Sequence, residues 1–144
     1  MRINMSYSEF KKLFFILRFP IVVFTLDKLI NIPFDLYKMF PLLDIPMHFI
    51  GGASIAVSAV LWWRYKCGSL KTAKINKIFS LLWIIGIVSF TAIVWEFYEF
   101  ASDYFFHTEW QFGSADVVGD MFFGLAGGGA AGWYKIYRHN NTGK

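Results

Sequence analysis

IFSLLWIIGIVSFTAIVWEF, residues 78–97, is the stretch of sequence that decides the fold. It carries one charged residue, Glu96, in its last turn. A hydrocarbon core about 30 Å thick requires about 20 consecutive apolar residues of α-helix, so this stretch predicts a membrane-spanning helix. The rest of the chain agrees, because 56% of its residues are hydrophobic and only 17% are charged, against about 25% charged in soluble domains.

Further apolar segments lie on both sides of this stretch. Together they predict four membrane helices over residues 13–31, 45–63, 78–99 and 116–134. The first is the weakest, because Arg18, Pro20 and Asp27 interrupt it. We therefore expect an all-α, polytopic integral membrane protein, in which residues 1–144 form a single four-helix bundle.

Charge predicts the orientation of the bundle. The loop 64–77 carries five Lys and Arg and no acid, and such a loop belongs in the cytoplasm. With four spans, both termini are cytoplasmic, and twelve of the fourteen Lys and Arg share that side with the single acid Glu9. The outer side, with its acidic loop 100–115, holds the other nine carboxylates. We expect a multi-pass protein of the cell membrane, whose net charge of +4 reflects topology and not nucleic-acid binding.

Polar residues gather in one layer beneath the outer surface. Counting about 1.5 Å per residue from the cytoplasmic ends places one polar residue on each helix about 22–27 Å across the core: Asp27, His48, Glu96 and Asp120. A second set lies closer to the outer surface: Asp44, Glu99, Asp103 and Asp116. An ionised carboxylate at the centre of a membrane helix costs about 2.5–3.5 kcal/mol, and less near its ends. This layer must therefore hold protons, bind a cation or open to water.

The spacing of these residues predicts a metal site. Glu96 and Glu99 are three residues apart and Asp116 and Asp120 four, so each pair shares one helix face. With His48 they form a candidate ligand set. Carboxylate and imidazole together suit Zn²⁺ or Mn²⁺, and an all-oxygen set suits Mg²⁺ or Ca²⁺. We interpret Glu96, Asp120 and His48 as candidate catalytic residues. The supporting residues are Asp27, Asp44 and Asp103.

His48 has a second reading, in which its imidazole orients Asp44 or Asp116 by a hydrogen bond. Glycines support the site in either case. Gly124, Gly128 and Gly132 continue the four-residue stripe of the last helix, and Gly52 shares a face with His48. Small residues let membrane helices approach closely, so we expect the carboxylates of this stripe to face the bundle interior.

Three motifs in this order resemble the YjdF-like family of small bacterial membrane proteins: Asp44-x-x-x-His48-Phe49-x-x-Gly52, Trp95-Glu96-x-x-Glu99 and Asp116-x-x-x-Asp120-Met121. They are similar, more distantly, to VanZ-like proteins, which show D-x-x-x-H-F, E-x-x-Q and D-x-x-x-N. Glu99 and Asp120 stand where VanZ-like proteins have Gln and Asn. The resemblance implies a bundle of four or more helices with a polar centre near the outer leaflet, and it implies no particular reaction.

Three classes of function fit these residues. The first is an enzyme acting on a lipid-linked or headgroup substrate at the outer leaflet, with a bound cation activating water. The second is a small transporter or a proton- or cation-coupled carrier, and the third is a non-catalytic accessory membrane protein. All polar groups lie in the outer half, so no proton path crosses the bundle, which favours the first class. The sequence leaves the metal, the substrate and the oligomeric state open.

Overall fold

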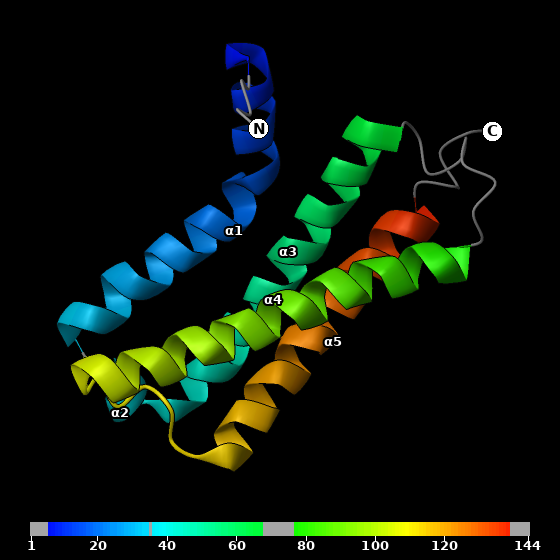
Figure 1. Ribbon diagram of the computed structural model, residues 1–144. Coiled ribbons are helices and arrows are strands. Elements are labelled where there is room, and N and C mark those ends of the chain that lie inside the picture. Colours follow the sequence, from blue (N-terminus) through cyan, green and yellow to red (C-terminus); the bar gives the residue numbers. More distant parts are fainter. Residues whose placement is uncertain (1–5, 35, 68–76, 139–144) are drawn as a thin grey trace.

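The computed structural model describes residues 6–34, 36–67 and 77–138, which form helices joined by short connections, with no strand among them. The predicted all-α class is therefore confirmed. Four long helices make up the bundle (Figure 1): α1 (Tyr7–Phe34), α3 (Asp44–Cys67), α4 (Lys77–Phe106) and α5 (Ser114–Arg138). A short helix α2 (Leu36–Met39) and a 3-10 turn (Pro41–Leu43) connect α1 to α3. Among the described residues, the segments Pro41–Cys67 and Lys77–Phe106 are long and apolar enough to cross a membrane.

The helices extend beyond the predicted spans. α4 has 30 residues, about 45 Å of helix, so it is longer than a hydrocarbon core is thick. It contains no helix breaker before Phe106, and residues 100–106 of the expected acidic loop are therefore helical. The chain leaves the helix at His107 and Glu109, which both have positive φ angles. At the opposite end, residues 68–76 of the expected basic loop lie outside the described residues.

α3 is the central helix and packs against α1, α4 and α5. Its crossing with α5 is a contact of backbone on backbone. A Cβ atom at Gly52 would lie 1.9 Å from the carbonyl oxygen of Gly124, and one at Gly127 would lie 1.9 Å from that of Phe49. No side chain fits at either position, so glycine sets this helix separation.

α4 also packs against glycines of α5, on the stripe formed by Gly124, Gly128 and Gly132. A Cβ atom at Gly128 would lie 2.7 Å from the side chain of Val88, and one at Gly132 would lie 3.1 Å from Ile84. Val88 and Ile84 belong to the buried core, whose other members are Ala56, Ala59, Val60 and Ile136. The stripe therefore serves two neighbours, α3 at its first turns and α4 further along.

α1 joins the bundle through a backbone defect. Pro20 lies inside α1, and a proline cannot donate the helical hydrogen bond to the carbonyl four residues earlier. That carbonyl belongs to Ile16, and the Ser58 hydroxyl of α3 donates to it at 2.8 Å. Both residues are buried. The acceptor that proline leaves free is thus satisfied by the neighbouring helix.

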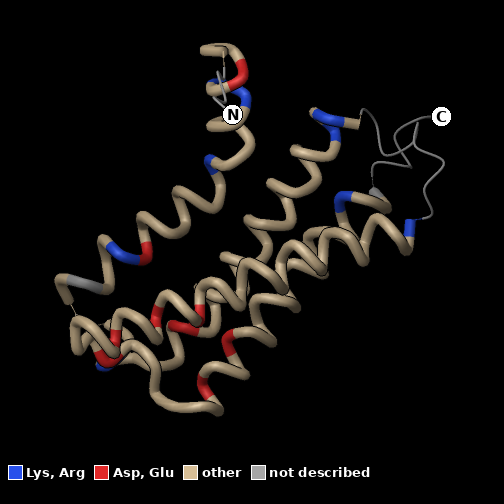
Figure 2. Tube along the Cα trace, in the orientation of Figure 1, with Lys and Arg blue, Asp and Glu red and all other residues tan. Residues whose placement is uncertain are grey.

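Charges divide along the bundle (Figure 2). Within the described residues, Lys and Arg gather where α1 and α4 begin and α3 and α5 end, and Asp and Glu gather at the opposite end. Glu9 is the described acid at the basic end, and Lys28 and Lys38 are the described cations at the acidic end. We call these two regions the basic end and the acidic end.

Candidate functional site

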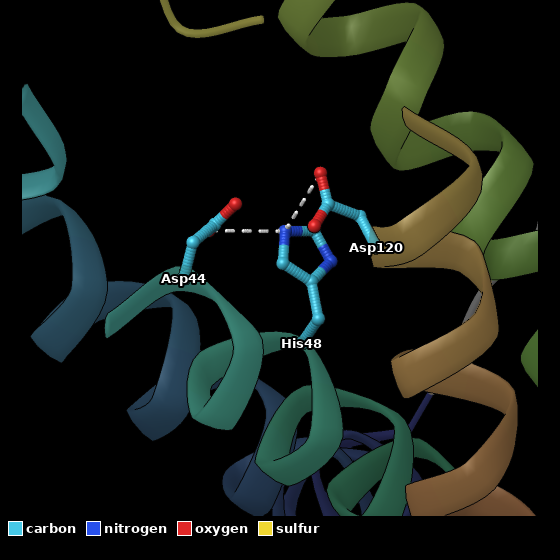
Figure 3. Close-up of side chains that lie close together, drawn as sticks. All are labelled: Asp44, His48 and Asp120. Carbon is cyan, nitrogen blue, oxygen red and sulfur yellow. Dashed lines mark ion pairs between the residues drawn. The ribbon is translucent and has the colours of Figure 1, made fainter. Parts of the chain in front are cut away.

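A histidine between two carboxylates forms the centre of the acidic end (Figure 3). Asp44 opens α3, His48 follows one turn later, and Asp120 projects from α5. The Nε2 atom of His48 lies 3.2 Å from Oδ1 of Asp44 and 3.7 Å from Oδ2 of Asp120. Gly52 and Gly124 each follow one turn later on the same helices. Their close contact therefore holds His48 and Asp120 opposite each other.

α4 adds two more carboxylates to this centre. One atom each of His48, Glu96 and Glu99 lie within 4.8 Å of one another, and the same holds for Asp44, His48 and Asp120. Only 6–8% of Glu96, Glu99 and Asp120 is exposed. Buried charges are normally paired or bound to a metal. Hereafter the acid–His cluster means Asp44, His48, Glu96, Glu99 and Asp120, and either of its two groups has the spacing of a metal site.

Lys28 of α1 is the cation nearest to this cluster within the described residues. Its Nζ atom lies 3.1 Å from Oδ2 of Asp27 and 3.8 Å from Oε1 of Glu99. The ammonium also lies 4.2 Å from the ring centre of Trp110 and 5.0 Å from that of Trp95. Cation–π attraction and two carboxylates together stabilise a buried lysine. Lys28 thus offsets the charge of Asp27 and shares Glu99 with the cluster.

Tyr37 closes the site from α2. Its hydroxyl donates a hydrogen bond to Oδ1 of Asp27, and its backbone N–H donates to Oδ1 of Asn31 at 3.2 Å. Burial, and then the hydrogen bond to Asp27, raise the pKa of the Tyr37 phenol above its ordinary value. The phenol therefore remains a proton donor, and it fixes one oxygen of Asp27.

Two of the predicted acids have structural partners instead. Asp103 accepts hydrogen bonds from the Thr108 hydroxyl at 2.5 Å and from the backbone N–H groups of Trp110 and Gln111 at 2.7 and 2.9 Å. Asp116 accepts one from the N–H of Phe112 at 3.0 Å. Both carboxylates hold the loop between α4 and α5. Within the described residues, neither belongs to a group with metal-site spacing.

That loop delivers Gln111, which sequence reasoning missed. Its Nε2 atom donates to Oε2 of Glu96 and to the carbonyl oxygen of the same residue, both at 3.1 Å. Of the residues predicted as ligands, His48, Glu96, Glu99 and Asp120 belong to the groups with metal-site spacing, which also include Asp44, predicted as a supporting residue, and do not include Asp116. Tyr37 was also missed. A lone Gln or Tyr in a connection between long helices gives no periodic signal. Only the conformation of these connections brings Gln111 to Glu96 and Tyr37 to Asp27.

A cavity of about 350 Å³ adjoins the acid–His cluster. It lies among α1, α3, α4 and α5, with Tyr37 of α2 at its polar end. The polar end also presents Asp27, Asp44, His48, Glu99 and Asp120. The opposite part is largely apolar, with walls that include Ile21, Phe24, Met47, Ile55 and Val88. An apolar cavity with a few convergent polar groups at one end is the usual form of a small-molecule site.

Comparison with known proteins places the chain among membrane proteins. A family model described as "Predicted membrane protein (DUF2238)" matches residues 12–141, which include all five members of the acid–His cluster. No curated protein and no solved structure matches the chain.

Proposed function

Because the chain belongs to the DUF2238 family of predicted membrane proteins, we propose that it crosses the bilayer four times and binds a divalent cation at the acid–His cluster. Two segments are apolar and long enough to span on their own. α1 and α5 have 28 and 25 residues, about 42 and 38 Å of helix, so each is also longer than a hydrocarbon core of about 30 Å is thick. Both pack against α3, which supports spanning by all four.

Charge supports one orientation. The positive-inside rule places the basic end in the cytoplasm, because the described Lys and Arg other than Lys28 and Lys38 lie there. Both termini are then cytoplasmic, and the acid–His cluster lies beneath the outer face of the cell membrane. Asp and Glu contribute little to orientation. Topology therefore accounts for the basic end and leaves the acidic end to be explained by function.

One observation carries the cation proposal. Two groups of three possible ligands share His48 and draw on three helices, and each group has metal-site spacing, although three of the five residues are buried carboxylates. Like charges at this range repel strongly in a medium of low dielectric constant. A divalent cation removes that repulsion. A site that includes His48 suits Zn²⁺ or Mn²⁺, and binding by the carboxylates alone suits Mg²⁺ or Ca²⁺.

Such a cation supplies Lewis-acid chemistry at the membrane surface, where it polarises a substrate oxygen or activates water. His48, Glu96 and Asp120 are the candidate acid–base groups beside it. We infer an enzyme that acts on a lipid-linked or cell-envelope substrate in the outer leaflet. The cavity supports this class over a carrier, because its polar end lies at one depth and its remainder is apolar.

A matched pair of variants on α5 tests the cation site. Asp120→Asn removes a member of the acid–His cluster, whereas Asp116→Asn, one turn earlier, removes a carboxylate that holds the loop. Elemental analysis of purified protein is expected to find one divalent metal per chain in the wild type and in Asp116→Asn, and much less in Asp120→Asn. Wild-type protein without metal after dialysis against Mn²⁺, Zn²⁺, Mg²⁺ and Ca²⁺ would contradict the proposal.

A further inference from the structure

We propose that the cavity beside the acid–His cluster holds the hydrocarbon chain of a membrane lipid. The lipid enters between α1 and α4, and its uncharged, hydroxyl-bearing head faces the cluster. This assignment rests on the cation site proposed above and names the class of lipid that reaches it. Three features support it: the length and lining of the cavity, its open side and the polar groups at its end.

The cavity has the shape of a slot for one chain. Its lining runs from Asp44 to Ile55 on α3 and from Glu99 to Val88 on α4, which is about 16 Å along each helix at 1.5 Å per residue. The hydroxyl groups of Ser54 and Thr91 in its lining donate within their own helices, so water in its apolar part would find few hydrogen-bond partners. A void there would lose dispersion contacts on one side. A hydrocarbon chain from the surrounding bilayer satisfies both conditions.

We place the open side of the slot between α1 and α4, which both line it. α1 packs mainly on α3. Near the acidic end, α1 reaches α4 through the rings of Phe24 and Trp95, whose centres are 5.2 Å apart, and through the contact of Lys28 with Glu99. Among the described residues, α1 and α4 are not one of the extensively packed helix pairs, so we expect a chain in the bilayer to have lateral access between them. Gly51 lines the slot from α3, and a Cβ atom there would meet nothing within 4 Å.

The polar end selects the head group. Four carboxylates and His48 line it, together with Tyr37, and no Lys or Arg does so among the described residues. One divalent cation leaves this end with excess negative charge, so an anionic head is repelled. Asp120 is 6% exposed and accepts no hydrogen bond from the described residues, and its Oδ2 atom lies 3.7 Å from Nε2 of His48. A hydroxyl group donates to such a carboxylate and also offers the cation an oxygen ligand.

Photolabelling of the full chain tests the slot. The probe is a monoacylglycerol with a diazirine in its chain, in phosphatidylcholine vesicles that hold the protein and Mn²⁺. Labels are expected on residues that line the slot, such as Ile21, Met47 and Ile55. Gly51→Leu fills the slot and is expected to reduce this labelling about tenfold, equivalent to about 1.4 kcal/mol. Leu favours helix over Gly, so the variant is expected to fold.

Gly86→Leu is the matched control. Gly86 also has open space around a Cβ atom, but it faces outward on α4 and does not line the cavity. Its labelling in the slot is expected to equal that of the wild type. Labelling that is spread over the lipid-facing surface, or that survives Gly51→Leu, would overturn the slot. Equal labelling by the lysophosphatidate with the same chain would overturn the head-group assignment.

Metal content of the same samples separates this proposal from the proposed function. Gly51→Leu alters none of the five cluster residues and is expected to keep its metal. Loss of slot labelling with the metal retained supports the chain slot. If the wild type holds no metal and its slot labelling is still lost in Gly51→Leu, the cation site fails and the chain slot stands.

Discussion

The basic and acidic ends of this bundle are built on the same four helices, but the side chains buried in them differ in polarity. Toward the basic end the core is apolar, with Ala56, Ala59, Val60, Ile84 and Ile136 packed closely. Toward the acidic end the buried side chains are charged, and they include Asp27, Glu96, Glu99 and Asp120. The first region needs only shape complementarity, because all its partners are apolar. The second needs counter-charges. Within the described residues, the Lys28 ammonium lies close to Asp27 and Glu99, and the His48 imidazole lies close to Asp44 and Asp120.

The two regions differ in what each can lose. Close packing stabilises the apolar core, whereas buried charges are costly unless the surrounding structure pairs them. Between the two regions lies the glycine crossing of α3 and α5, one turn from His48 and Asp120. The crossing therefore belongs to both regions, and changes there are expected to have the largest effect.

The first prediction concerns a substitution at the crossing of α3 and α5 that is expected to disturb both regions. Gly52→Ala would place a methyl group 1.9 Å from the Gly124 carbonyl oxygen, which forces α3 and α5 apart. We expect a loss of about 3 kcal/mol in the free energy of unfolding, the upper part of the usual range for overpacking, together with loss of the proposed metal binding. Gly51→Ala is the control. Its Cβ atom meets nothing within 4 Å, so we expect a gain of about 0.5–1 kcal/mol.

Thermal unfolding in detergent measures both variants. If Gly52→Ala unfolds like the wild type, the close crossing of α3 and α5 is wrong, and with it the placement of Asp120 opposite His48.

The second prediction concerns the attachment of α1. Ser58→Ala removes the hydrogen bond to the Ile16 carbonyl that Pro20 leaves free. A buried acceptor without a partner costs about 1–3 kcal/mol, so we expect destabilisation of about 2 kcal/mol. The control is Ser89→Ala, because the Ser89 hydroxyl donates only within its own helix, to Ile85. Its expected effect is below about 0.5 kcal/mol.

The metal content of Ser58→Ala is measured in the same experiment. Ser58 lies far along α3 from the acid–His cluster, so the folded fraction of Ser58→Ala is expected to keep its metal. A loss of metal without a loss of stability would show that α1 positions the cluster.

The third prediction isolates the acidic end. Lys28→Met removes a cation that lies 3.8 Å from Glu99 while it keeps a long, unbranched side chain. A divalent cation then no longer competes with an ammonium group for Glu99, and we expect its affinity to rise about tenfold, or about 1.4 kcal/mol. Titration with Mn²⁺ measures this change. An unchanged affinity would indicate that Glu99 is not a ligand.

The sequence predicts the all-α class because hydropathy is a local property. A run of apolar residues indicates a helix wherever its neighbours lie, and the described charges divide between the two ends of the bundle. The end of α4 was less predictable. Helix length follows from the turn at His107 and Glu109, and their positive φ angles have no signature in composition. The neighbours of the glycine stripe were also less predictable. The four-residue spacing places these glycines on one face, but only the packed structure shows that Gly124 contacts α3 and Gly128 contacts α4.

The candidate site was predictable only where residues share a helix. Three- and four-residue spacing places Glu96 beside Glu99 without knowledge of the fold. The choice between Asp44 and Asp116 could not be made in this way. Asp116 is held by the N–H of Phe112, a contact that depends on loop conformation. Lys28 reaches Glu99 across the sequence, so its role becomes visible only once the helices are packed.

The smallest predicted effect also lies at the acidic end, outside its buried part. Lys38 and Glu109 form an ion pair at 3.0 Å, but their side chains are 42% and 76% exposed. Exposed pairs of this kind contribute about 0–1 kcal/mol. We therefore expect Glu109→Gln to change the free energy of unfolding by less than about 1 kcal/mol and to leave Mn²⁺ affinity unchanged. A large change in affinity would mean that the long-range field of the acidic end, and not the acid–His cluster alone, binds the cation. Because salt screens exposed charges beyond about 10 Å at 0.1 M ionic strength, repeating the titration in high salt separates these two origins.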